Sequence, residues 1–346
     1  MFDTAPPPVA PPPPPAQSPT GSIFDCADAP DRVGVRPILN PDLWAMYKTN
    51  GLPSMWFVED VSLVEDVKQW PTLNEGTQRF VKYVLAFFHG ADKLVAENLS
   101  INFAEEVPIL EAQIYYRFQA MAEDIHSDMY ATLVDALITD ADEKRLIFED
   151  LGSKPVVAAK NAWASAFSDR AAAPLTERLV AFAVVEGVFF SASFCAIYYL
   201  RSQGVLPGLC FSNDYIARDE GQHCLFACML YGHVKPEHRL SQARVYEIFD
   251  EAVRIESEFV KEAIPVGLIG MNADLMSQYV RYVADFWITR LGYEKRFGDK
   301  NPFPFMNAIG MQGKTNFFER RVGDYTRANV GTADASDRAF AIDDEF

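Results

Sequence analysis

The sequence predicts an all-α protein built on a bundle of long helices. From about residue 41 to about residue 310, apolar residues recur at alternating spacings of three and four, the pattern of amphipathic helices. The alternation typical of β-strands is almost absent. A third observation, a duplicated set of acids and histidines within these helices, indicates which kind of bundle to expect.

Six potential metal ligands occur as two similar halves, each a single acid followed by Glu-x-x-His: Asp92, Glu123 and His126, then Glu186, Glu220 and His223. The acids of the two halves are similarly spaced, 31 residues from 92 to 123 and 34 from 186 to 220. Residues three apart share a helix face, so each Glu-x-x-His pair can direct both side chains at one target. Ferritin-like bundles hold two metal ions with this set, and we therefore expect a ferritin-like helical bundle with a dinuclear metal site and extra helices.

The acids lie within apolar stripes, which distinguishes them from ordinary surface acids. Asp92 interrupts a stripe formed by Leu85, Phe88, Val95 and Leu99. On the second helix, the ligands are expected along one edge of a core side marked by four apolar residues: Ile114, Phe118, Ile125 and Met129. Buried carboxylates are too costly without compensation, and two divalent cations would supply about four positive charges. Oxygen-rich ligands with two imidazoles favour iron or manganese over a structural zinc site.

The third of these helices has an alternative interpretation. Leu179 to Leu200 includes one charged residue, Glu186, and its 22 positions would be long enough to span a membrane. An acid near the middle of a lone span is costly, and no second span or flanking basic cluster occurs. The central helix of a large bundle, apolar on all sides, explains the stretch better.

Composition excludes some classes of function. The 346 residues are 49% hydrophobic and 13% aromatic, enough for a large core, and the net charge is −17. Such an acidic chain is not suited to bind nucleic acid or an anionic membrane. The five cysteines contain no CxxC pair and no signal peptide is evident, so we expect a reducing, cytoplasmic setting.

The chain is expected to divide into a disordered proline-rich arm (1–35), a helical domain (36–315) and a flexible C-terminal tail (316–346). The first 20 residues contain nine prolines and cannot pack a core. An extended polyproline ligand for an SH3-type partner is the alternative to a plain leader. The tail is polar and rich in small residues before its last seven residues, FAIDDEF.

Three aromatic residues near the ligands suggest redox chemistry rather than metal storage. Tyr130 lies one turn beyond His126 on the ligand face, and Phe190 and Phe194 follow Glu186 by one and two turns. Such rings could exclude water from a reactive species, but an ordinary core helix shows the same pattern. Position alone leaves both interpretations open.

Long blocks of the sequence resemble the radical-generating small subunit of class I ribonucleotide reductase, in its eukaryotic-type form. The similarity extends from about residue 40 to the end of the chain. It is carried by LAFFHGADKLVAENL (85–99), AEDIHSDMY (122–130), VEGVFFSASF (185–194), FSNDYIARDEGQHC (211–224), GMN (270–272) and GKTNFFERRVGDY (313–325).

The resemblance implies that three residues hold each metal: Asp92, Glu123 and His126 the first, and Glu186, Glu220 and His223 the second. It also implies that the carboxylates of Glu123 and Glu220 bridge the two ions. A di-iron centre is expected first, with a dimanganese centre as the alternative, because both metals accept these ligands.

The same resemblance implies a radical relay. Tyr130 matches the residue that is oxidised to a stable tyrosyl radical, and Trp56 matches the tryptophan that transfers the electron. Asp219 is expected to join Trp56 to His126 through hydrogen bonds. The hydrophobic pocket of the radical is expected to contain two rings: Phe190 and Phe194.

The tail would link this chain to a large subunit. Tyr325 matches the tyrosine through which the radical leaves, and the end of the chain resembles the peptide that docks on that subunit. The docking residues would be Phe340, Ile342, Asp343, Asp344, Glu345 and Phe346. The implied activity is reduction of ribonucleoside diphosphates to deoxyribonucleotides for DNA replication, with the small subunit acting as a homodimer.

Two other classes of function would use the same ligands. A dimetal monooxygenase or oxidase of this fold would need neither Tyr325 nor a docking tail. An iron-storage bundle would be a shorter chain and would dispense with Trp56 and Tyr130.

Overall fold

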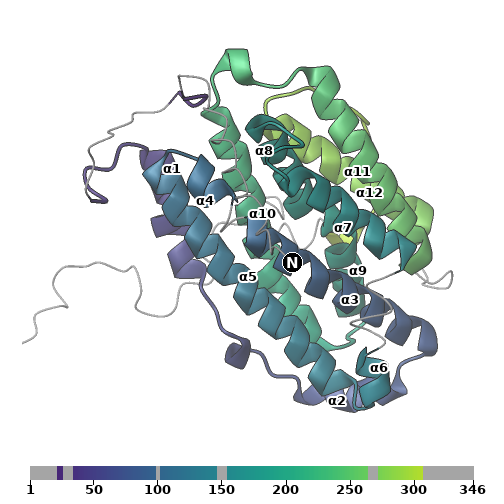
Figure 1. Cartoon of the computed structure of the whole chain (residues 1–346). Helices are drawn as coiled ribbons and strands as arrows, with labels where there is room; N and C mark the ends of the chain where they lie inside the picture. Colours follow the sequence, from purple (N-terminus) through teal and green to yellow (C-terminus); the bar gives the residue numbers. More distant parts are fainter. Residues whose placement is uncertain (1–21, 26–33, 99–101, 146–153, 264–271, 307–346) are drawn as a thin grey trace, which may run out of the picture.

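The computed structural model describes residues 22–25, 34–98, 102–145, 154–263 and 272–306, while the side chains of residues 89–98 lie outside the description. Helices make up all the regular structure of this part of the chain, apart from one isolated antiparallel bridge between Phe24 and Val234. The all-α prediction is confirmed (Figure 1).

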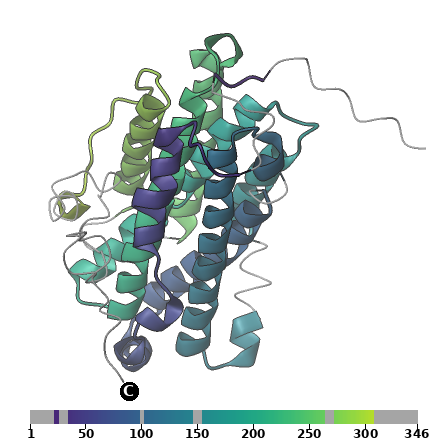
Figure 2. The same cartoon turned by 90° about the vertical axis from the view of Figure 1, so that its left-hand side faces the viewer.

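Four long helical segments form the bundle that carries the predicted ligands (Figures 1 and 2). They are α3 (Glu75–Asn98), α5 (Leu110–Leu137), the segment Leu175–Ser202 and α10 (Pro207–Gly232). Helix α3 packs along α5, α10 packs on the segment Leu175–Ser202, and α10 also contacts α5. These contacts turn one face of each segment toward a common interior.

The remaining helices cover or extend this bundle. Helices α7 (Pro155–Ser168), α11 (Gln242–Ala263) and α12 (Ala273–Arg290) all pack on the segment Leu175–Ser202, and α11 contacts both α7 and α12. The others are short: α1 (Pro41–Ala45), α2 (Val64–Gln69), α4 (Ala104–Glu106) and α6 (Ala141–Arg145).

A π turn interrupts the segment Leu175–Ser202, within which the sequence predicts one continuous helix from Leu179 to Leu200. The segment consists of α8 (Leu175–Val184), the π turn η7 (Val185–Phe189) and α9 (Ser191–Ser202). A π turn inserts an extra residue into the helix and is frequent at functional sites. The most apolar stretch of the segment is completely buried inside the protein, as expected for a central bundle helix rather than a membrane span.

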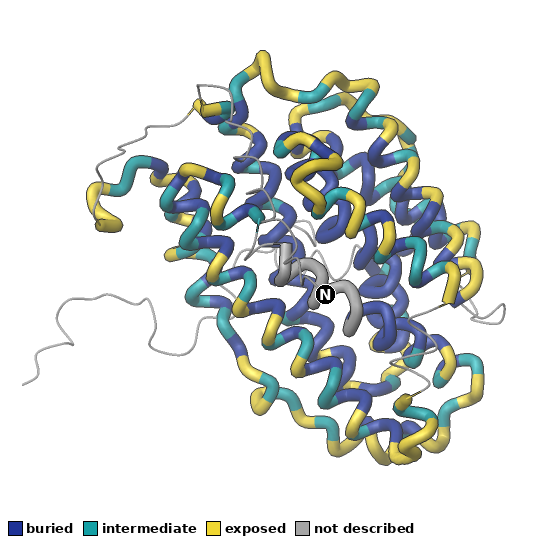
Figure 3. The backbone as a smooth tube through the Cα atoms, viewed as in Figure 1, coloured by how far each residue is buried: buried dark blue, intermediate teal, exposed yellow. Residues whose placement is uncertain are grey.

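The buried face of α5 differs from the prediction. Ile114, Phe118 and Ile125 are only partly buried, whereas Glu123 and His126 are at most 1% exposed. Buried residues line the interior of the bundle and exposed residues lie on its outside (Figure 3). The face with the ligands is therefore the core face itself, not its edge. The reason is that the carboxylate cluster occupies the centre of the bundle, so α5 turns its ligands inward.

The packed structure begins before the predicted domain boundary at residue 36. Phe24 is 3% exposed and forms the bridge with Val234. The backbone N–H of Lys235 also donates to the carbonyl of Ile23 at 2.9 Å. The prediction of a disordered arm is wrong for residues 22–25, because this short segment pairs with a loop that is distant in sequence. The residues before it, and the tail after residue 306, lie outside the described residues.

Asp66 of α2 fixes the start of α10. Its buried carboxylate accepts hydrogen bonds from the backbone N–H groups of Gly208 and Leu209, each at 2.8 Å. N–H groups in the first turn of a helix lack partners within the helix, and the helix dipole favours a negative charge there. Glycine is required at 208, because a Cβ would lie 2.5 Å from the carbonyl oxygen of Ser62. Helix α2 thereby positions the helix that carries two of the ligands.

We expect Asp66→Ala to lower the free energy of unfolding of the metal-free protein by about 2 kcal/mol, because two buried N–H groups lose their acceptor. Urea denaturation followed by circular dichroism measures this change. The control is Glu65→Ala, which removes an exposed carboxylate paired with Lys68 and should cost less than about 0.5 kcal/mol. Equal effects of the two substitutions would contradict the capping role.

Candidate metal centre

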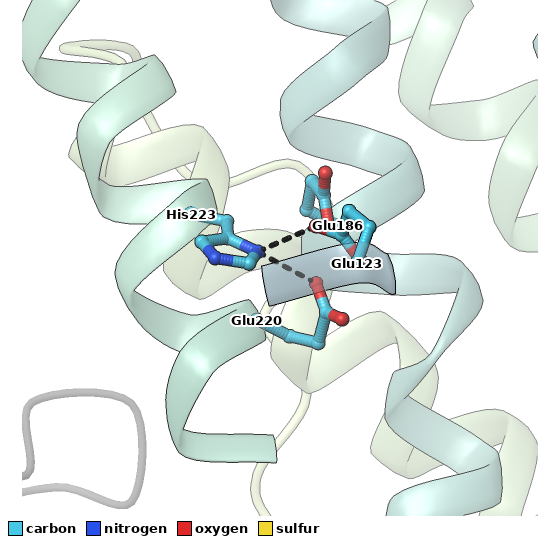
Figure 4. Close-up of side chains that lie close together, drawn as sticks. All are labelled: Glu123, Glu186, Glu220 and His223. Atoms are coloured by element: carbon cyan, nitrogen blue, oxygen red, sulfur yellow. Dashed lines mark hydrogen bonds and ion pairs between the residues drawn. The ribbon is translucent and has the colours of Figure 1, made fainter. Parts of the chain in front are cut away.

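Three carboxylates and one imidazole converge in the interior of the bundle (Figure 4). Glu123 of α5, Glu186 of η7, and Glu220 and His223 of α10 each place a ligand atom within 4.8 Å of the others. All four residues are at most 2% exposed. They come from three separate helical segments, so the cluster exists only once the bundle has folded.

His126 makes the cluster nearly symmetrical. Its Nδ1 atom lies 3.0 Å from a carboxylate oxygen of Glu220 and 3.2 Å from one of Glu123. Nδ1 of His223 lies 2.9 Å from Glu123 and 3.2 Å from Glu220. Each of these two glutamates therefore contacts both imidazoles. A carboxylate in this position is suited to bridge two ions, each bound to one imidazole.

Asp92 is the one predicted ligand whose side chain lies outside the described residues. Its backbone belongs to α3, which packs along α5, the helix of Glu123 and His126. The role of Asp92 as a ligand stays a prediction.

The buried carboxyl groups of the cluster need positive charge nearby to offset their lost hydration. Burial alone would raise the pKa of Glu220, but hydrogen bonds with Glu186 and the two histidines outweigh burial and hold it below its usual range. Burial alone would lower the pKa of His223, but the carboxylates of Glu123 and Glu220 outweigh burial and raise it to about 9. In the metal-free protein, protons on the imidazoles thus balance the negative charge of the carboxylates. Bound metal ions would balance this charge instead. The donor set, rich in oxygen with two imidazoles, fits a pair of iron or manganese ions.

Gln119 is a site residue that the sequence analysis missed. Its amide donates to a carboxylate oxygen of Glu186 at 3.0 Å, and the residue is completely buried. It precedes Glu123 by one helical turn and therefore lies on the same helix face as the ligands. A polar residue at this position is the sequence feature that could have predicted its role. The hydrogen bond orients Glu186 from outside the cluster, as partners behind metal ligands commonly do.

Asp219 connects His126 to Trp56 through a single carboxylate oxygen. The indole N–H of Trp56 donates to Oδ2 of Asp219 at 2.8 Å, and Nε2 of His126 lies 3.3 Å from the same atom. Arg218 donates to the other oxygen at 2.8 Å and to the carbonyl of Ser54 at 2.5 Å. Burial alone would raise the pKa of Asp219, but Arg218 and His126 outweigh burial and lower it. The three residues are therefore in contact as expected, and their part in electron transfer stays a prediction.

Trp56 is itself buried, at 3% exposed, and stacks on Tyr215. The two ring centroids are 5.1 Å apart and the planes differ by 16°. The guanidinium of Arg218 lies 5.2 Å from the centre of the Tyr215 ring, and Phe211, 39% exposed, contacts its edge. Tyr215 thus lies between Trp56 and the surface, a position that no local sequence pattern indicated.

Tyr130 lies in a pocket of phenylalanine rings. It is 2% exposed and stacks on Phe88 with ring centroids 4.8 Å apart. Phe190 and Phe194 lie 5.5 Å and 5.4 Å from Phe88. Both predicted pocket residues therefore belong to this ring cluster, and Phe88 is the ring that joins them to Tyr130.

The predicted exit of the radical and the docking peptide lie outside the described residues: Tyr325, Phe340, Ile342, Asp343, Asp344, Glu345 and Phe346.

We expect the affinity of the metal-free protein for divalent manganese to rise with pH from about 6.5 to about 9. A histidine binds a metal ion only as the neutral imidazole. Because the pKa of His223 is raised, its imidazole has to lose a proton when the metal binds. The same proton stabilises the metal-free fold below pH 6.5, and this contribution is lost as the pH rises through about 9. Anaerobic calorimetric titration in two buffers of different ionisation enthalpy measures the protons released. Binding without proton release would contradict the prediction.

Comparison with known proteins identifies the family of this chain. The family model described as ribonucleotide reductase, small chain, matches residues 32–302. The ribonucleoside-diphosphate reductase small chain of Nicotiana tabacum is 46% identical over 323 residues, covering 92% of this chain and 97% of that protein. The subunit M2 of Homo sapiens is 45% identical over 317 residues, covering 92% of this chain and 80% of that protein.

Solved structures give the same result. The Rnr4 homodimer of the Saccharomyces cerevisiae reductase matches with a TM-score of 0.73 and 30% identity, over 87% of this chain and 91% of that one. A putative class I ribonucleotide reductase of Bacillus halodurans matches with a TM-score of 0.72 over 77% of this chain and 98% of that one; at 22% identity it supports the fold alone. This chain belongs to the ribonucleotide reductase small-chain family.

Proposed function

We propose that this chain is the radical-generating subunit of a ribonucleoside-diphosphate reductase and that the radical forms on Tyr130. The proposal rests on one observation, that the metal cluster, the tyrosine in its ring pocket and the Asp219–Trp56 pair are built around the same group of helices. The carboxylate and imidazole cluster has Tyr130 in a ring pocket on one of its helices and the Asp219–Trp56 pair behind His126. An iron-storage bundle or a simple oxidase would not require both.

Six residues would hold the two ions: Asp92, Glu123, His126, Glu186, Glu220 and His223. Iron is the metal we propose, and the donor set also suits manganese. When bound, the metal pair supplies the oxidising power, drawn from dioxygen, that removes an electron and a proton from Tyr130. Carboxylates favour such chemistry because they can change between chelating and bridging modes.

The protein's own part is to protect the oxidised tyrosine. Phe88 covers one face of the Tyr130 ring, and Phe190 and Phe194 pack behind it. Apolar rings offer no exchangeable hydrogen atoms and exclude water, so a radical at Tyr130 would be shielded from small reductants.

Trp56 would deliver an electron during activation and later relay the oxidising equivalent outward. Asp219 is suited to this task because its charged carboxylate accepts the indole N–H and can stabilise a positive charge on the ring. From Trp56 the equivalent would pass to Tyr325 and then to a cysteine of the large subunit, where the ribonucleotide is bound.

The partner would be the large subunit of the reductase, recognised by the tail residues Phe340 to Phe346. A flexible tether with a few apolar and acidic anchors can dock firmly while it leaves Tyr325 free to move. We also propose a homodimer, supported by the homodimeric Rnr4 structure, and a cytoplasmic location, supported by the cysteine pattern.

Tyr130→Phe should keep both metal ions but abolish the tyrosyl radical and ribonucleotide reduction, because phenylalanine cannot be oxidised at this site. Metal analysis, electron paramagnetic resonance (EPR) after oxygen exposure, and turnover with the large subunit measure the three properties. The matched control is Tyr279→Phe, a buried tyrosine of α12, which should retain the radical. Full activity of the Tyr130 variant would overturn the assignment.

Deletion of residues 335–346 should abolish binding to the large subunit and leave the metal site intact. Affinity measurements with the isolated large subunit, together with metal content and the radical signal, separate the two effects. The deletion also tests the oxidase alternative, because a free-standing oxidase would retain its whole activity without the tail.

A further inference from the structure

A buried ion pair lies outside the metal cluster. Lys160 of α7 and Glu256 of α11 are both 0% exposed, and the lysine Nζ is 2.7 Å from a carboxylate oxygen. Neither helix carries a predicted metal ligand. A buried ion pair contributes little net stability, because removing both charges from water is costly. The pair therefore calls for a role other than stability.

The ammonium group has a second partner in the π turn. Lys160 Nζ donates to the carbonyl of Phe189, the last residue of η7, at 2.6 Å. The rings of Phe87 and Phe259 also face the ammonium, with centroids 3.3 Å and 4.1 Å away. Contacts from α3, α11 and the π turn thus hold the nitrogen in one place.

This π turn carries Glu186. The extra residue of a π turn breaks the regular i to i+4 ladder, so the path of the turn depends on contacts from outside the helix. Among the described residues, two side chains from other helices donate hydrogen bonds to backbone carbonyls of the turn: Trp287 to Gly187 at 3.2 Å and Lys160 to Phe189. Gly187 lets the indole approach, because a Cβ would lie 2.4 Å from Nε1 of Trp287.

We propose that Lys160 is a positioning residue that sets the π turn and thereby the direction of the Glu186 carboxylate, and that Glu256 keeps Lys160 charged in the apolar interior. The inference rests on the proposed function, in which Glu186 is a metal ligand. It makes the lysine–glutamate pair part of the metal-binding machinery without contact to a metal ion.

The charge balance of the pair is consistent with this role. Burial lowers the pKa of Lys160 to about 8, against the opposing effect of Glu256. Burial raises the pKa of Glu256 to about 7, against the opposing effect of Lys160. Each group therefore favours the charged form of the other.

The test compares stability with metal binding in the full-length, metal-free protein. Lys160→Met/Glu256→Gln removes both charges with little change in volume, which avoids a lone buried charge. Anaerobic titration with manganese(II), followed by EPR, distinguishes a coupled pair of ions from a single isolated ion. We expect affinity for the second ion to fall about tenfold to a hundredfold, as is typical when a group that orients a ligand is lost. The free energy of unfolding should change little.

The matched control is Arg178→Met, which breaks the ion pair with Glu106 away from the π turn. It should lower stability but leave both manganese affinities unchanged. If the double variant folds poorly, Lys160→Met alone replaces it and is compared with the wild type at the same pH of 6, where Glu256 is protonated and no lone charge remains.

Two outcomes separate this inference from the proposed function. If the Lys160 variants bind two ions as tightly as the wild type while Glu186→Gln binds only one, the positioning role is overturned and the ligand assignment stands. If Glu186→Gln also binds two ions with unchanged affinity, the assignment of Glu186 as a ligand fails, and the positioning role fails with it.

Discussion

The structure depends on accommodating three carboxyl groups inside an otherwise apolar bundle. Glu123, Glu186 and Glu220 are at most 2% exposed and lie within contact of one another. Burial removes the hydration of these groups, and a buried charge needs compensation from partners such as imidazolium groups or metal ions. The surrounding structure follows from this constraint, because ligands that must stay close despite repulsion have to be held by rigid helices and by hydrogen bonds from behind.

The two surroundings of the cluster differ in chemistry. Tyr130 lies among phenylalanine rings, which offer neither charge nor exchangeable protons. Asp219 links His126 to Trp56 through charged hydrogen bonds, and Arg218 holds the carboxylate in place. An oxidised residue is protected best by inert rings, whereas transfer of an electron needs polar groups that stabilise the charge formed. Different residues around the cluster meet these two requirements.

Sequence periodicity and the Glu-x-x-His spacing were sufficient to predict the bundle and the convergence of five of the six proposed ligands. They could not predict the π turn, because a segment that is apolar on all sides has no polar face from which its twist can be read. Tyr215 and the Lys160–Glu256 pair were missed for another reason: their partners are distant in sequence. The buried face of α5 was misplaced because Glu123 and His126 were counted as polar, although they form the centre of the core.

The same apolar character explains why buried polar contacts gather at the π turn. A helix that is hydrophobic all round packs almost equally well in several rotations about its axis, so apolar packing alone specifies the position of Glu186 poorly. Hydrogen bonds are directional, and three of them reach this turn from neighbouring helices, from Gln119, Trp287 and Lys160. Apolar packing therefore stabilises the segment Leu175–Ser202 in the core. The few polar contacts select the rotation of this segment about its axis, and its position along that axis, that bring Glu186 to the cluster.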